Sequence, residues 1–454
     1  MTDYSKRHSK RASLAAVGVQ MRRWRIWETV GKHVRIKQKV ILHTPLDKLL
    51  DAFINILAGG RGLVETNKNV RADPGLQRAF GRERCAEQST ISDTINASTE
   101  ENVEQMRQAV TEVYRTYGQG YRHPYRTHLQ LLDVDMTGMP AGRTGEGVEK
   151  GFFSGKRNRR GRQLGRVVAT QYNEVVVDRL YRGKRQMERS LQELVTAAEE
   201  VLELDEFRRK RTIIRVDGGG GRDADVNWML DRGYHVVVKN KSWKRAYKLA
   251  ESVSRWCVDP KTGDREVGWV EESHLYVRPT RQIAIRTPRK DGSWLYWVLV
   301  SSLSDEELLL LARQPCRGKP TLMQVMFAML YAYDLRSGGV ETSIKGSKQG
   351  LGLTKRNKKR FAAQEMLVLL AQLAYNLTIW IRDLLANQSS KLRGYGLLRM
   401  VRDLFQIDGC IHWDAQGRIM AIMLNKYDPF TEHFVTGLAS IWGQDDMYPN
   451  LGQN

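Results

Sequence analysis

Two stretches of the chain carry carboxylates at positions that suit metal chemistry. In "LLDVDMTG" apolar and acidic residues alternate with period two, so Asp133 and Asp135 lie on one face of a predicted strand. In "RTIIRVDGGGGRDADV" a β-branched run ends at Asp217, and four glycines follow. This second stretch fits a plain turn, or a metal ligand beside which a bulky group approaches the backbone. It lacks the glycine spacing of dinucleotide-binding and Walker loops, so nucleotide binding does not fit.

Strands and helices interleave around these aspartates. Further strand is predicted in "VVATQYNEVVVDRLYRG", a long helix in "RQMERSLQELVTAAEEVLEL", and a helix followed by a strand in "VNWMLDRGYHVVVK". Residues from about 241 to 325 interrupt this rhythm with a predicted hairpin, whose turn is Asp291-Gly292. Trp294 and Trp297 in this hairpin are packing residues or platforms on which bases stack. The pattern predicts an α/β core that contains a β-rich insertion.

The N-terminal region is predicted to be basic and helical. The first forty residues hold eleven lysines and arginines against Asp3 and Glu28, which is typical of a basic arm or of a solvated tail. A helix is predicted to begin at Thr44-Pro45 and to end before Gly59-Gly60. The stretch "AEQSTISDTINASTEENVEQMRQAV" predicts two further helices, either a helix-turn-helix DNA reader or an ordinary helical pair.

Charge and composition point to an anionic partner. The 454 residues include 73 Lys and Arg against 51 Asp and Glu, a formal net charge of +22, and nucleic acid is the commonest partner of such a chain. The apolar segment 366–381 is too short to span a bilayer and includes Gln372 and Asn376, so we expect a buried helix and no membrane partner. The four cysteines are scattered without a C-x-x-C pair, which suits a reducing cytoplasm and argues against structural zinc.

Three motifs in order resemble the insertion-sequence DDE transposases of the group with a Tyr–Arg–Glu–Lys signature. "LLDVDMTGMPAG" resembles the first-strand motif and gives Asp135. "IIRVDGGGGRDADVNWMLDRGYHVVVK" resembles the second-aspartate block and gives Asp217. "YDLRSGGVETSIKGSKQGLG" resembles the signature block and gives Tyr333, Arg336, Glu341 and Lys348. The β-rich interruption before the third acid is also typical of this group.

The signature departs from the family pattern in one place. Four residues separate Arg336 from Glu341, where the family usually has three, and we expect the Gly-Gly segment to absorb the extra one before the helix begins. Lys348 lies seven residues after Glu341, nearly over it on one helix face, and Lys345 lies one turn from Glu341. Arg336, Lys345 and Lys348 are predicted to bind DNA phosphates, although ordinary surface charge would explain the same residues. Asp133 remains an alternative to Asp135.

The resemblance implies a fold, a site and partners. The fold is an RNase H-like mixed five-stranded sheet flanked by helices, with a β insertion and a helical N-terminal domain. The catalytic and metal-binding residues are Asp135, Asp217 and Glu341, which hold two Mg²⁺ or Mn²⁺ ions, and Tyr333 joins the basic residues at the DNA. The glycines after Asp217 would then let a phosphate backbone approach. The implied segments are 1–125 (arm and DNA-binding helices), 126–240 and 326–395 (catalytic core), 241–325 (insertion) and 396–454 (C-terminal region).

The implied activity is cleavage and strand transfer on double-stranded DNA. Partners are the terminal inverted repeats, the target DNA and a second copy of the chain, in the cytoplasm of a bacterium or archaeon near the nucleoid. Two alternatives stay open. One is a catalytically silent DNA-binding regulator derived from a transposase, and the other is a metal-dependent nuclease without strand transfer.

Overall fold

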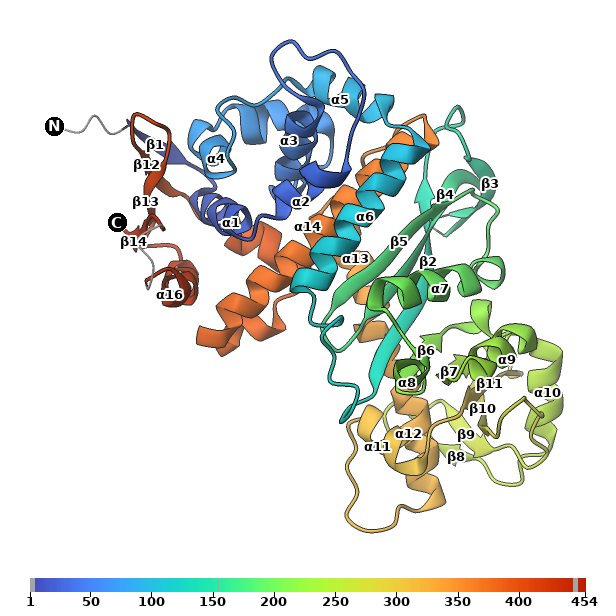
Figure 1. The fold of residues 1–454 in the computed structure, drawn as a ribbon. Coiled ribbons are helices and arrows are strands. Elements are labelled where there is room, and N and C mark those ends of the chain that lie inside the picture. Colours follow the sequence, from blue (N-terminus) through green and yellow to red (C-terminus); the bar gives the residue numbers. More distant parts are fainter. Residues whose placement is uncertain (1–4, 154, 444–447) are drawn as a thin grey trace. The chain divides into compact units, whose positions relative to one another are not determined.

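The computed structural model describes residues 5–153, 155–443 and 448–454 and divides the chain into two compact units. The central unit comprises residues 119–138 and 163–342. The terminal unit comprises 1–118, 139–162 and 343–454, and therefore contains both chain ends. Each unit combines helices with a sheet (Figure 1). Segments far apart in sequence thus build each unit. The predicted division, in which residues 126–240 and 326–395 form one core interrupted by 241–325, stays a prediction.

A mixed sheet forms the core of the central unit. β2 (Gln130–Pro140) runs parallel to β6 (Thr212–Val216), and β6 runs parallel to β7 (His235–Lys239). On the other side of β2 lie β4 (Lys156–Ala169) and then β5 (Glu174–Tyr181), which are antiparallel to each other. Every residue of β6 is buried, as expected for a parallel strand with both faces covered. Helix α7 (Leu191–Leu202) packs on β5, and α9 (Asp223–Asp231) packs on β7.

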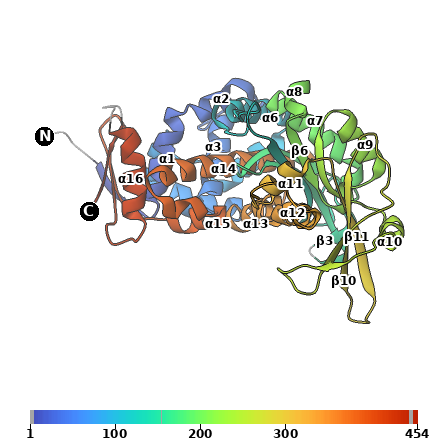
Figure 2. The same ribbon diagram turned by 90° about the horizontal axis from the view of Figure 1, so that it is seen from below.

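The insertion extends this sheet instead of forming a separate layer. β11 (Trp294–Ser301) pairs with β7, and β10 (Arg281–Pro288) pairs with β11 in the predicted hairpin (Figure 2). β9 (Glu266–Trp269) and β8 (Cys257–Val258) follow. Counting β3 (Glu149–Phe153), the sheet has ten strands among the described residues. The insertion adds β11, β10, β9 and β8 at the free edge of β7, and the predicted five-stranded core without them stays a prediction.

Apolar side chains cover both faces of the extended sheet. Helix α12 (Leu322–Asp334) packs its Val325, Met326 and Met329 against Ile213 and Leu299. On the other face, α10 (Trp243–Glu251) packs on β10 and β11. Lys239 lies over the ring of Trp297, and Arg286 lies over the ring of Trp294. These contacts favour packing roles for both tryptophans. The remaining helices of this unit are α8 (Glu206–Arg209) and α11 (Asp305–Leu311).

Helix α14 (Phe361–Gln388) is the core helix of the terminal unit. It is long and apolar enough to cross a membrane by length and composition, but 89% of its most apolar window is buried within the protein. The predicted helix after Thr44 is confirmed as α3, and Thr44 and Asp47 form a reciprocal capping box. The helices around α14 are α1 (Ala12–Arg23), α2 (Ile26–His33), α3 (Pro45–Leu57), α4 (Pro74–Ala79), α5 (Gln88–Ala97) and α6 (Glu100–Tyr117).

The predicted basic arm is wrong for most of the first forty residues. Helices α1 and α2 bury Leu14, Val17, Met21 and Ile26, so this segment is folded. β1 (Ser5–Ser9) pairs with β12 (Gly409–Trp413), about 400 residues later in the chain. The two ends share one small sheet, seen near both chain ends in Figure 1. Its other members are β13 (Ile419–Leu424) and β14 (Asn450–Gln453), and the C-terminal helices are α15 (Leu397–Arg399) and α16 (Thr431–Trp442).

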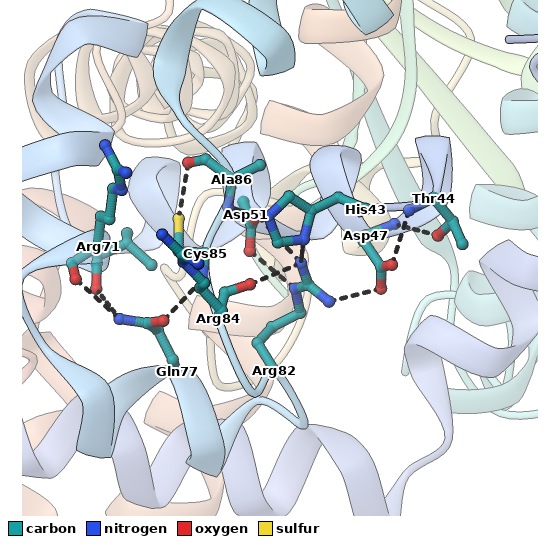
Figure 3. A network of polar contacts seen from close by, with 11 residues as sticks. His43, Thr44, Asp47, Asp51, Arg71, Gln77, Arg82, Arg84, Cys85 and Ala86 are labelled. Atoms are coloured by element: carbon teal, nitrogen blue, oxygen red, sulfur yellow. Dashed lines mark hydrogen bonds and ion pairs between the residues drawn. The ribbon is translucent and has the colours of Figure 1, made fainter. Parts of the chain in front are cut away.

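A buried polar network fixes the segment that leads into α5 (Figure 3). Arg82 Nε donates to Asp51 Oδ1 at 2.9 Å, and Arg82 Nη1 lies 2.7 Å from Asp47 Oδ1. The backbone N–H of Ala86 donates to Asp51 at 2.7 Å, and that of Cys85 donates to Gln77 at 2.7 Å. Burial raises the pKa of Asp51, although Arg82 opposes that shift. The network therefore ties residues 82–86 to α3 and α4.

Candidate active site

Asp135 lies on β2 in a nearly closed environment. Its side chain is 17% exposed, and its Oδ1 accepts a hydrogen bond of 2.7 Å from the N–H of Met136. Burial raises the pKa of Asp135 to about 6. Arg336 opposes that shift, and Asp217 and Glu341 add to it. The three predicted acids therefore act on one another electrostatically within the central unit.

Asp217 lies at the end of β6, next to the strand that carries Asp135. Its Oδ1 accepts a hydrogen bond of 2.9 Å from the N–H of Gly219, which orients the carboxylate. A Cβ on Gly221 would lie 1.8 Å from the carbonyl oxygen of Lys239, and a Cβ on Gly220 would lie 2.6 Å from Val216. Close packing against β7 at Gly221 and against the preceding strand β6 at Gly220 thus explains these two glycines without any approaching ligand.

Glu341 comes from the third element, helix α13 (Val340–Gly350). A short 3-10 turn over Leu335–Gly338 precedes this helix and absorbs the extra residue of the signature. Arg336 in that turn connects two of the acids. Its Nη1 donates to Glu341 Oε1 at 2.7 Å, and its Nη2 lies 3.1 Å from Asp135 Oδ2.

The position of Arg336 differs from the prediction. Its side chain is 7% exposed and points among the acids, whereas a phosphate contact requires an accessible guanidinium. Within the described part of the chain, its Nε has no hydrogen-bond partner. Arg336 therefore serves here as a counter-charge between Asp135, which is largely buried, and Glu341, whose side chain is 51% exposed.

The other predicted site residues differ in how far they are buried. Tyr333 at the end of α12 is partly buried, and burial raises its pKa to about 12. Asp217 and Glu341 add to that shift, so Tyr333 belongs to the same cluster. Lys345 is exposed and Lys348 is partly buried. From Ser343 onward α13 belongs to the terminal unit, so both lysines lie in a different unit from the three acids, and their predicted role stays a prediction.

Asp133 has a structural partner that the sequence did not reveal. It is fully buried, and Arg215 donates to its two oxygens at 2.6 and 2.8 Å. Thr170 Oγ1 donates to it at 2.7 Å, and a Cβ on Gly339 would lie 2.4 Å from its Oδ2. Both carboxylate oxygens of Asp133 therefore already accept hydrogen bonds from the protein. Of the two aspartates on β2, this geometry favours Asp135 as the available ligand.

Sequence reasoning missed Arg215 and Thr170 as supports of the site. Arg215 is an arginine in the middle of a buried strand, "TIIRV", and a charge in such a run signals a buried partner. The arginine in this strand thus indicates that a buried partner exists, but the sequence alone does not show that the partner is Asp133.

The donor set of the acid cluster suits a hard divalent cation. Asp135, Asp217 and Glu341 offer only carboxylate oxygens, the ligands that Mg²⁺ and Mn²⁺ prefer. Among the residues that the structure describes, however, no group of three or more His, Cys, Asp or Glu side chains gathers closely enough to hold an ion. Arg336 supplies the positive charge between Asp135 and Glu341. The ligand atoms of the three acids fit such an ion. Binding would require Arg336 to release its contacts with Asp135 and Glu341.

The raised pKa of Asp135 predicts a pH-dependent stability cost. At acid pH, below the ordinary value of 3.8, the carboxyl is protonated in both the folded and the unfolded chain and costs nothing. Between that value and about 6 the unfolded chain ionises first, so the stability falls as pH rises, and above about 6 the full cost remains. We expect Asp135→Asn to be more stable than the wild type at pH 7.5 by on the order of 2 kcal/mol and equally stable near pH 3.5. Urea unfolding at both pH values measures this, and an equal difference at the two pH values would contradict it.

The chain is similar to a known protein family and to a solved structure. A family model described as a transposase DDE domain matches residues 126–377. None of the curated proteins matches the chain. Among solved structures, the cryo-EM structure of a piggyBac transposase synaptic complex with hairpin DNA is similar, with a TM-score of 0.47 and 11% sequence identity over 85% of this chain and 79% of that chain. Because the family model covers more than half of the sequence, the chain belongs to the DDE transposases.

Proposed function

We propose that the chain is the transposase of an insertion sequence and that it cleaves and rejoins DNA at the acid cluster of the central unit. The observation that carries this proposal is the convergence of Asp135, Asp217 and Glu341 around Arg336. These acids come from two neighbouring parallel strands and one helix. That arrangement suits metal-dependent phosphodiester chemistry, in which carboxylates from distant segments meet.

We further propose that β5, β4, β2, β6 and β7 are an RNase H-like core. Their order in the sheet supports this, because an antiparallel group (β5, β4) lies beside β2 and two parallel strands follow on its other side. Asp135 follows Val134, the last residue of β2 that pairs with β6, and Asp217 follows the last residue of β6. Both acids thus lie at the carboxyl end of the paired parallel region, which is where sites form in such sheets.

Two Mg²⁺ or Mn²⁺ ions are the proposed cofactors, held by Asp135, Asp217 and Glu341. When bound, such ions stabilise the charge that develops on the attacking and leaving oxygens. Arg336 balances the acids before metal arrives and then becomes available to DNA phosphates, for which its forked donors are suited. Tyr333, Lys345 and Lys348 are also proposed to contact DNA.

The proposed partners follow from this activity. They are the terminal inverted repeats, the target DNA and a second copy of the chain on the paired ends. The proposed reaction is cut-and-paste transposition, and the proposed location is the bacterial or archaeal cytoplasm at the nucleoid.

An assay on the element's own ends tests the proposal. The purified chain is incubated with a plasmid that carries the flanking DNA of its gene, with Mg²⁺, with Mn²⁺ or with a chelator, and cut and joined products are scored. We expect both products with either metal and neither with the chelator. Binding without cleavage would support the silent regulator instead, and cutting without joining would support a nuclease.

A positioning role is predicted for Arg265 of the insertion. Arg265 makes a two-point contact with Asp334, two residues before Arg336, through Nη1–Oδ1 at 3.1 Å and Nη2–Oδ2 at 2.6 Å. It also contacts buried Asp259, which accepts a hydrogen bond from Tyr331 at 2.7 Å. The insertion thereby holds the end of α12, from which the signature turn begins.

Removing this contact should slow the chemistry and spare DNA binding. We expect Arg265→Ala to lower kcat about tenfold, because small displacements of catalytic groups are costly, with KM for DNA unchanged. Arg281→Ala is the matched control, since Arg281 pairs with Asp305 elsewhere in the same unit. A parallel rise in KM, or equal rates for the two variants, would exclude a positioning role for Arg265.

A further inference from the structure

We propose that a basic surface of the terminal unit binds the phosphate backbone of duplex DNA. It is called the basic ridge here and consists of two segments, one from the β3–β4 hairpin and one that precedes α14. The inference rests on the proposed function, because it takes DNA as the substrate. Its members are Lys150, Arg157, Arg159, Arg160, Lys355, Lys359 and Arg360.

The hairpin concentrates positive charge. Residues 149–162 include six lysines and arginines and one acid, Glu149. Lys150 and Arg160 are directly opposite each other across the two strands. Like charges in that position destabilise a strand pair unless an anion lies between or beside them. This pairing therefore indicates a surface built to meet an anion.

Five side chains of the ridge have no carboxylate partner among the described residues. Arg157, Arg159 and Arg160 form no ion pair there, and neither do Lys355 and Lys359. Glu146, the acid in the preceding loop, accepts a hydrogen bond of 2.8 Å from the N–H of Phe361. It caps the first residue of α14 and so has a structural role of its own.

Arg162 joins the two halves of the ridge. It is buried, and its Nε donates to the carbonyl of Glu146 at 2.7 Å. Its Nη1 and Nη2 donate to the carbonyls of Lys358 and Lys359 at 3.0 and 2.8 Å. Burial lowers the pKa of Arg162. A buried guanidinium that contacts three carbonyl oxygens thus holds the segment 355–360 beside the hairpin.

The ridge is also tied to helix α5. Lys358 Nζ donates to Ser92 Oγ at 2.5 Å, and Arg360 donates to the carbonyl of Asn96. Ser89, Thr90 and Asp93 of the same helix are exposed. Small polar side chains can reach base edges, whereas lysine and arginine at phosphates fix position without reading sequence. We assign phosphate binding to the ridge, and α5 is placed to make base contacts beside it.

The test measures how DNA binding depends on salt. The triple variant Arg157→Ala, Arg159→Ala, Arg160→Ala removes three charges from the ridge. The control variant Lys391→Ala, Arg393→Ala, Lys426→Ala removes three exposed charges elsewhere in the terminal unit. Fluorescence anisotropy with a 30-base-pair duplex of arbitrary sequence, over roughly 50–300 mM salt, gives the affinity of the full-length proteins.

The ridge variant should lose both affinity and salt dependence. Each lost phosphate contact flattens the slope of log affinity against log salt by about 0.9, so we expect a slope smaller by about 2–3 and a Kd at least about tenfold higher near 100 mM salt. The control should bind as the wild type does. Lys355→Ala, Lys359→Ala keeps the hairpin intact and should flatten the slope by about 1–2.

The possible outcomes test the role of the basic ridge and the proposed function separately. If the wild type binds with a steep slope and both ridge variants keep it, the ridge is not the binding surface, and the transposase proposal stands. Equal losses in the ridge and control variants would also overturn the inference, because general charge would then be responsible. A wild type that neither binds nor cuts DNA would overturn both.

Discussion

Asparagine in place of Asp135 or Asp217, or glutamine in place of Glu341, is expected to abolish DNA cleavage. Each change removes one negative charge and one metal-binding oxygen from the cluster while keeping the shape of the side chain. We expect each rate to fall at least about a thousandfold, or about 4 kcal/mol of transition-state stabilisation. Single-turnover cleavage of a labelled end measures the loss. Binding of the same end should change less than about twofold, because the role proposed for these residues is to hold metal and not DNA.

Two further variants make this prediction specific. Glu306 is an exposed acid on α11, and Glu306→Gln should cleave at the wild-type rate. The double variant Asp135→Asn, Glu341→Gln should be no slower than either single one, since groups that act as a unit are not additive. Asp135→Asn should also be more stable than the wild type at pH 7.5, which separates lost chemistry from lost folding. Residual Mg²⁺-dependent cleavage within about tenfold of the wild type would remove that residue from the site.

Short sequence patterns correctly predicted the elements whose structure is decided by residues within the same element. Thr44-Pro45 predicted the beginning of α3, and Asp291-Gly292 predicted the β10–β11 hairpin. In each case the residues that decide the structure are neighbours in sequence. The acid after "RTIIRV" was placed at a strand end for the same reason. These predictions needed no knowledge of distant contacts.

Predictions failed where a distant partner decides the structure. The charge of the first forty residues suggested an arm, but the apolar spacing of Leu14, Val17 and Met21 builds a buried helix, and β1 pairs with a strand about 400 residues away. Alternation placed Asp133 and Asp135 on one face and could not separate them, because only Arg215 distinguishes the two. The inward position of Arg336 likewise depends on where three other segments place their carboxylates.

The largest stability effect is expected at Asp133. Arg215 and Asp133 form a buried pair with two hydrogen bonds, and Arg215 Nη1 also donates to the carbonyl of Ala332. Removing one partner leaves an uncompensated buried charge, which typically costs about 3–5 kcal/mol. We expect Asp133→Ala to destabilise the central unit by that amount. Any loss of cleavage in this variant should then follow the loss of folded protein, unlike the loss in Asp135→Asn.

A double replacement shows whether charge or packing causes the loss. Asp133→Leu, Arg215→Met removes both charges and should recover all but about 1–2 kcal/mol of the stability, since apolar residues can replace a buried ion pair. Arg281→Ala breaks a half-exposed pair with Asp305 and should cost less than about 1 kcal/mol. Urea unfolding at pH 7.5 compares all of these with the wild type. An Asp133→Ala chain within about 1 kcal/mol of the wild type would mean that Arg215 finds another partner, and Asp133 would again compete with Asp135 as the first metal ligand.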